Sequence, residues 1–168
     1  MKKNISFTIL LLSFVFSIYA QDSFRIEANV GLTIGDSQEY YSYTLQGNFY
    51  YFWEVSKNIY IGPTTGALVF LGEGDNRNGS ENFFGSIPEI YIPIAVASRI
   101  KLSKSISIGL DTGYGLNATL DSEEGGFYFR PLIVYNLKEK LALIGAYSNI
   151  TEKAYTASTI NFGVNFGF

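Results

Sequence analysis

Carboxylates are the side chains of this sequence with the clearest capacity for chemistry. Asp121, Glu123 and Glu124 are close neighbours, and clustered carboxylate oxygens can hold a divalent cation. The same grouping is typical of a solvated loop, which is the simpler interpretation. Paired carboxylates can also act as general acid and base, but no pair here has a spacing that singles it out. We therefore predict no metal site and no cofactor.

Two residue types that supply many enzyme active sites are missing. The 168 residues include no cysteine and no histidine. The sequence thus has no thiolate nucleophile, no disulfide framework and no imidazole base. Two glycine-rich fragments, 72–74 and 113–115, lack the full spacing of a phosphate-binding loop and precede no predicted helix. No catalytic residue is predicted, and the chain is expected not to be an enzyme.

The elements that position the remaining charged residues follow a period of two. At the end of the chain, the apolar residues Ile160, Phe162, Val164, Phe166 and Phe168 alternate with polar residues or glycine. The same alternation recurs over 24–34 and 106–116. A period of two indicates a β-strand with two unlike faces, and an amphipathic helix would repeat every 3.6 residues.

Short and long connections alternate along the chain. Three short links, 55–59, 102–106 and 137–141, contain lysine between apolar strand ends and predict tight hairpin turns. Four longer polar segments, 35–40, 72–82, 117–126 and 151–154, predict loops. Together they separate eight strands, so we predict an all-β, eight-stranded, antiparallel, up-and-down barrel. The turn lysines form too small a basic patch to indicate nucleic-acid binding.

The composition of the two strand faces predicts which face points outward. The polar face is mostly Gly, Asn, Ser and Thr, which suit a crowded lumen, and charged residues make up only 16% of the chain. The apolar face carries two aromatic bands, as expected at the two interfaces of a bilayer. We assign to this aromatic girdle Tyr41, Tyr43, Trp53, Tyr114, Phe127, Phe129 and Tyr135. A soluble lipocalin-like barrel has the same period and stays open as an alternative.

The first twenty residues have the pattern of a secretory signal peptide. Lys2 and Lys3 precede a largely apolar segment, 7–16, and Ala20 is a small residue suited to cleavage. The apolar segment is shorter than the roughly 20 residues that a spanning helix needs. We predict a signal peptide over 1–20, cleavage between Ala20 and Gln21, and a barrel domain over 21–168 in the bacterial outer membrane.

The leader, the alternating strands and the terminal Phe168, preceded by Phe166, Val164 and Phe162, resemble the small OmpA/OmpX-type outer-membrane barrels. The resemblance covers the whole predicted mature chain. It implies that the C-terminal strand is the signal read by the outer-membrane assembly machinery. Outer-membrane lipid and this machinery are the expected partners of a monomer. Longer members of the group carry a periplasmic domain after the barrel, and no such domain is predicted here.

Charged residues also fall on the inward face. We place there Arg25, Glu27, Glu54, Glu89, Arg99, Lys101, Asp111 and Arg130. The two signs are nearly balanced, and an eight-stranded barrel is just wide enough for its side chains to fill. The expected result is a structural charge network that plugs the lumen. In the loops, by contrast, carboxylates outnumber cations, and the outer rim is predicted to be acidic.

The functional expectation is a non-enzymatic integral barrel with a structural or surface-interaction role. A porin-like channel is an alternative because charges inside a membrane are often functional. Passage of small apolar molecules is a further alternative, based on inward aromatic and aliphatic residues such as Tyr50, Phe52 and Phe70. A membrane-embedded lipid-acting enzyme is implied only by analogy with some similar barrels, which use a histidine that this chain lacks.

Prolines are the features of the sequence that fit the barrel least well. Pro63, Pro93 and Pro131 fall inside predicted strands, where a closed barrel has no free edge for a residue without an N–H group. We expect bulges or strand ends at these positions. Together with Pro88, they leave the local strand boundaries open. The segment 83–100 is also longer than the roughly 9 to 11 residues needed to cross a bilayer, so its first part is expected to project outward.

Overall fold

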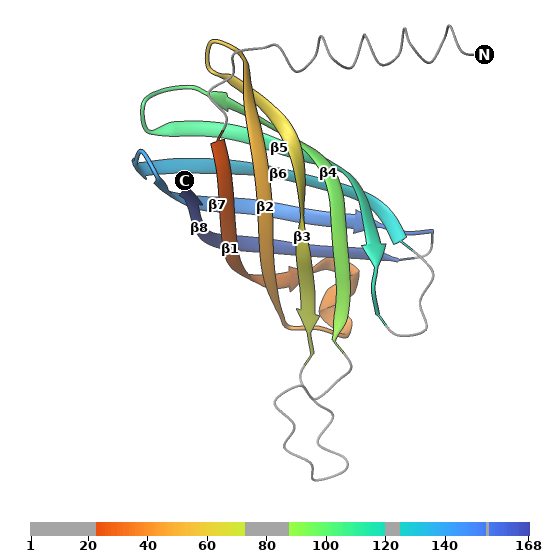
Figure 1. Cartoon of the computed structure of the whole chain (residues 1–168). Coiled ribbons are helices and arrows are strands. Elements are labelled where there is room, and N and C mark those ends of the chain that lie inside the picture. Colours follow the sequence, from red (N-terminus) through yellow and green to blue (C-terminus); the bar gives the residue numbers. More distant parts are fainter. Residues whose placement is uncertain (1–22, 73–87, 120–124, 154) are drawn as a thin grey trace, which may run out of the picture.

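The protein is an eight-stranded antiparallel barrel in which each strand pairs with the next and β8 pairs with β1 (Figure 1). The computed structural model describes residues 23–72, 88–119, 125–153 and 155–168. The strands are β1 (Ser23–Ile34), β2 (Tyr43–Ser56), β3 (Ile59–Leu71), β4 (Glu89–Lys101), β5 (Ile106–Asn117), β6 (Gly125–Lys138), β7 (Leu141–Thr151) and β8 (Thr156–Gly167). The predicted fold and strand number are confirmed. The signal peptide, its cleavage site and the Asp121, Glu123 and Glu124 cluster lie outside the described residues.

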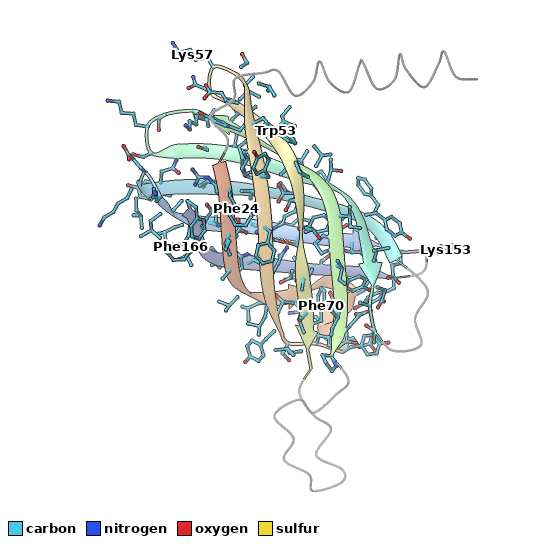
Figure 2. All side chains as sticks on the ribbon, viewed as in Figure 1. Phe24, Trp53, Lys57, Phe70, Lys153 and Phe166 are labelled. Carbon is cyan, nitrogen blue, oxygen red and sulfur yellow. The ribbon has the colours of Figure 1, made fainter. Side chains whose placement is uncertain are left out.

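Burial alternates along the strands as the period of two predicts. In β2 every second residue from Thr44 to Phe52 is buried, and the residues between them are largely exposed. The exposed positions carry large apolar side chains such as Val30, Ile133 and Phe162. Figure 2 shows many side chains standing outside the ribbon around the barrel. The molecule therefore has an apolar exterior and a polar, filled interior, the reverse of a water-soluble barrel.

The short links form tight turns at one end of the barrel, here called the turn end. In the β2–β3 turn, Asn58 adopts a left-handed conformation with φ of 70°, which asparagine tolerates better than most residues. The strand pairing shifts between Glu54 and Ser56 and between Asn136 and Lys138, so bulges lie directly beside two of the turns. The C-terminus lies at this end, where the Gly167 N–H donates to Lys140 O at 2.9 Å.

The opposite, loop end carries the longer connections. Figure 2 shows Lys57 at the turn end and Lys153 at the loop end. The segment predicted as a loop between β1 and β2 contains a short 3-10 helix, η1 (Gly35–Glu39). Its buried Ser37 hydroxyl donates to Ser158 O at 3.1 Å, which attaches η1 to β8. No helix in the described part of the chain is long and apolar enough to cross a membrane.

The prolines correct the sequence-based expectation. Pro63, Pro93 and Pro131 do not mark bulges or strand ends but lie within continuous strands. Each is paired on one side, with Val96, Gly115 and Leu110 respectively. On the other side the ladder has a short gap, although the register is unchanged. The missing N–H is thus accommodated by local loss of pairing, without an extra residue. Pro88, in contrast, directly precedes β4.

Candidate functional site

Arg130 is the centre of a buried network in the middle of the lumen. Its side chain extends inward from β6 and is 0% exposed. It forms ion pairs with Glu27 of β1 and with Asp111 of β5, the latter at 3.1 Å. It also donates to the Tyr50 hydroxyl at 2.8 Å and to Ser148 Oγ at 3.2 Å. A guanidinium can be buried only when its donors are satisfied in this way, and these contacts join β6 to β1, β2, β5 and β7.

Arg99 approaches the same network from β4. Its Nη1 and Nη2 donate to the two carboxylate oxygens of Asp111 at 2.5 Å and 3.3 Å. The guanidinium also lies over the Tyr50 ring, 5.0 Å from its centroid. Gly109 makes room for this arginine, because a Cβ at that position would lie 2.5 Å from Arg99 Cδ. Two arginines, Arg99 and Arg130, and two carboxylates, Asp111 and Glu27, thus form a layer without net charge.

A layer of neutral hydrogen bonds lies next to the charged layer on the loop side. The Gln46 Oε1 accepts from Ser148 Oγ at 2.9 Å and from Asn161 Nδ2 at 3.2 Å. Thr44 of β2 and Thr159 of β8, the two strands that flank β1, share a hydrogen bond of 2.7 Å. These side chains are all buried. Together with the charged layer they fill the cross-section, and the lumen is a packed interior at this depth.

Aromatic and aliphatic side chains close the lumen toward the loop end. Leu68, Phe70, Tyr91, Tyr128 and Ile150 form one buried cluster. Tyr41 packs on it, with its ring centroid 5.8 Å from that of Phe70. The assignment of Tyr41 to the outer aromatic girdle is therefore wrong: Tyr41 precedes β2, and its ring is directed to the lumen mouth. Burial, with a contribution from the Glu89 carboxylate, raises the pKa of Tyr41.

The charges predicted for the lumen lie in three separate groups. Glu27, Arg99, Asp111 and Arg130 share the central layer. Glu89 lies at the loop end, where it accepts from the Tyr91 hydroxyl at 2.7 Å. Arg25, Glu54 and Lys101 lie at the turn end around a small cavity. All eight of these residues lie on the inward face, but only the four of the central layer form ion pairs with one another among the described residues.

The other predicted residues lie on the outer surface. Tyr43, Tyr114, Phe127, Phe129 and Tyr135 are exposed, and Trp53 is partly exposed beside Tyr51, with ring centroids 5.3 Å apart. On β8, Phe162 and Phe166 are exposed and Val164 is partly buried, and Phe168, which directly follows β8, is exposed. Phe168 packs on Phe24 of β1, with ring centroids 5.8 Å apart. The C-terminal residue thus contacts the first strand of the barrel.

The arrangement favours packing over catalysis. Both carboxylates of the central layer are held by arginines and are 1% exposed, so neither is free to accept a proton from a substrate. Across residues 23–72, 88–119, 125–153 and 155–168, no three acidic side chains are grouped to hold a metal ion. The described part of the lumen therefore contains a plug and, at the turn end, one open cavity.

Sequence reasoning did not identify the neutral partners of this plug. Tyr50 was noted as an inward aromatic residue, but its hydroxyl donates to Asp111 Oδ2 at 3.1 Å and so belongs to the charged layer. Gln46 and Asn161 were not singled out. Their strands alternate clearly, and the signal that could have found them is their place on the same inward face as Glu27 and Arg130.

No family model matches the sequence, and no curated protein matches it. Solved structures with the same fold include the Yersinia pestis outer membrane protein Ail in a phospholipid bilayer nanodisc, at 11% identity, with a TM-score of 0.61 and coverage of 89% of this chain and 99% of Ail. Neisserial surface protein A is 10% identical, with a TM-score of 0.54, and the match covers 88% of this chain and 97% of that protein. The N-terminal barrel domain of Pseudomonas aeruginosa OprF is 10% identical, with a TM-score of 0.52, and the match covers 89% of this chain and 99% of that domain. The chain therefore has the fold of the small OmpA/OmpX-type barrels.

Proposed function

We propose that this chain is a non-enzymatic, integral outer-membrane barrel with a structural or surface-interaction role and a lumen that does not conduct. The observation that carries the proposal is the central layer around Arg130, in which every charge is paired and buried. Opening a path would separate these buried ion pairs and leave charges inside the barrel without their partners, so it is unfavourable. The absence of histidine, together with carboxylates fixed by arginines, argues against an enzyme.

The proposed location is the bacterial outer membrane, reached behind a signal peptide cleaved after Ala20. The apolar exterior supports a bilayer as the surrounding solvent. Outer-membrane lipid and the assembly machinery, which would read the strand containing Phe162, Val164, Phe166 and Phe168, are the proposed partners. The protein is proposed to act as a monomer and to bind no nucleic acid.

A surface-interaction role is supported by what is known of similar folds. One neighbour is an attachment invasion locus protein, and another is a surface protein. In this chain the loop end would face outward, and the turn end would face the periplasm. The longer connections are then the parts available to an external ligand, and the plugged barrel is the scaffold from which they start.

Site-specific labelling tests this orientation cleanly because the chain has no cysteine of its own. Lys153→Cys places a thiol at the loop end, and the matched variant Lys57→Cys places one at the turn end; both lysines are exposed. A membrane-impermeant maleimide added to intact cells should label Lys153→Cys, while Lys57→Cys should react only after the outer membrane is permeabilised. Equal labelling of both variants in intact cells, or of neither after permeabilisation, would contradict the proposal.

Planar-bilayer recording separates the plug from a porin-like channel. The folded wild-type protein should produce no conductance steps. Steps of reproducible size that disappear when the protein is omitted would favour the channel. The remaining alternative is passage of small apolar molecules through the barrel. Uptake of a small apolar solute into vesicles tests it, and equal uptake rates with and without the protein are expected.

A further inference from the structure

The turn end of the lumen contains a cavity that the plug does not fill. It has a volume of about 60 Å³ and is lined on its polar side by Arg25, Arg99, Lys101 and Asn165. Phe52 and Tyr60 contribute ring surfaces. A water molecule needs about 10 to 15 Å³ on this measure, so the cavity has room for about four waters. A phosphate or a short carboxylate has a comparable number of heavy atoms.

The cavity is closed at its inner end. The Arg99 guanidinium lies over the Phe52 ring, 5.3 Å from its centroid, and is fixed by Asp111. Beyond it is the central layer of paired charges. A solute that enters from the turn end therefore meets a wall and has no continuous path through the barrel.

The charges around the cavity are not balanced. Arg99 is neutralised by Asp111, but Arg25 has no carboxylate within ion-pair distance among the described residues, and its Nη1 donates only to Asn165 Oδ1 at 3.1 Å. Lys101 Nζ donates to the Tyr60 hydroxyl at 2.7 Å. That hydroxyl in turn donates to Glu54 Oε2 at 3.1 Å, so one carboxylate faces two cations. Among the described side chains named here, the excess is one positive charge.

Arg25 and Arg99 both line this cavity, so two guanidinium groups share one partly buried space. Two cations that line the same cavity attract an anion that bridges them. Arginine is particularly suited to this because its fork of N–H groups matches carboxylate and phosphate oxygens.

We propose that the turn-end cavity is a binding site for a small oxyanion, either a phosphate or a short carboxylate, held by Arg25 and Lys101 with Arg99 behind them. Phe52 and Tyr60 shield the anion from water on one side and so strengthen its contacts with the cations. The site is a dead-end pocket, and its occupancy does not require conduction.

Titration calorimetry tests the proposal with the whole folded barrel in a sugar-headgroup detergent, which contributes no phosphate. The probes are inorganic phosphate, propionate and propionamide, the neutral counterpart of propionate, all at one ionic strength set with chloride. Saturable binding of phosphate or of propionate is expected, and the stronger of the two identifies the oxyanion class. Propionamide should not bind. No saturable binding of either anion, or equal binding of propionate and propionamide, would overturn the proposal.

Variants assign the binding to this cavity. Arg25→Gln should weaken binding of the preferred anion at least about tenfold, the effect expected for loss of a charge-assisted hydrogen bond. Lys57→Gln removes the same charge from an exposed turn outside the cavity and should leave affinity unchanged. The faster migration of unboiled samples on a gel checks that both variants are folded. Equal affinity of the two variants would show that the anion binds elsewhere and would overturn the assignment.

Discussion

Asp111 and Arg130 face each other across the β5–β6 ladder, and their side chains form an ion pair of 3.1 Å inside the barrel. Arg130 also reaches Glu27, which is 103 residues away in the sequence and belongs to the strand that closes the barrel. One guanidinium thus contacts both a residue of the neighbouring strand and a residue of β1, the strand that closes the barrel. Its removal should affect the whole barrel and not one hairpin.

Arg130→Met should lower the free energy of unfolding by about 3 to 5 kcal/mol, because Glu27 and Asp111 would keep buried charges without their partner. Urea unfolding in detergent, followed by the fluorescence of Trp53, the single tryptophan, measures this. Arg25→Met, at the edge of the turn-end cavity, is the matched control and should cost less than about 1.5 kcal/mol, as for one hydrogen bond. Similar losses in both variants would show that the central layer has no special role in stability.

Gly109→Ala should destabilise the barrel by about 1 to 3 kcal/mol, since the new Cβ would meet the middle of the Arg99 side chain, which Asp111 holds in place. Gly145→Ala is the control: its Cβ would face outward, with Phe162 Cε1 at 3.7 Å as its nearest neighbour. A change within about 0.5 kcal/mol is expected there. Thermal unfolding of the two variants under identical conditions compares them, and a reversed order would refute the packing argument.

Ile94→Arg should lower the free energy of unfolding by about 2 to 4 kcal/mol. Ile94 is exposed midway along β4, so an arginine there would place its charge in the centre of a bilayer. Ile106→Arg, at the first position of β5 beside a turn, should lower the free energy of unfolding by no more than about 1 kcal/mol. Unfolding from lipid vesicles measures both. A barrel that is soluble in water would show equally small effects at the two positions.

Phe168→Ala should reduce the amount of folded barrel in the outer membrane of cells, because it alters the C-terminal strand that the assembly machinery is proposed to read. Phe24→Ala removes the same ring contact from the other side and leaves the C-terminal strand intact. The two purified variants should have similar stability after refolding. If both accumulate to the same level in cells, the ring contact and not the C-terminal signal determines assembly.

The period of two, together with the alternation of short and long connections, was sufficient to predict eight strands, three tight turns and the inward face. These features depend on neighbours in the sequence, since alternate residues point to opposite faces of a strand whatever its partners are. The same reasoning placed Glu27 and Arg130 inward. It could not pair them, because their contact depends on strand tilt and register around the closed barrel.

Tyr41 and the prolines fell outside this reasoning for a related reason. Tyr41 has the aromatic character of a girdle residue, but it precedes β2, where alternation no longer fixes the direction of a side chain. Pro63 stays within β3 because one of its two neighbouring ladders has a gap. Neither outcome is encoded in local periodicity.

The ladder between β1 and β8 joins residues 25–34 to residues 158–167, and so it joins the first strand of the barrel to the last. In a copy that lacks β8, the strands on either side of the gap would present unpaired N–H and C=O groups, which a lipid interior cannot satisfy. Such a copy could not settle as a smaller stable barrel. At the proposed outer-membrane location, closure would therefore act as a proofreading step: only copies with a complete β8 would resist proteases, and truncated copies would remain available for degradation.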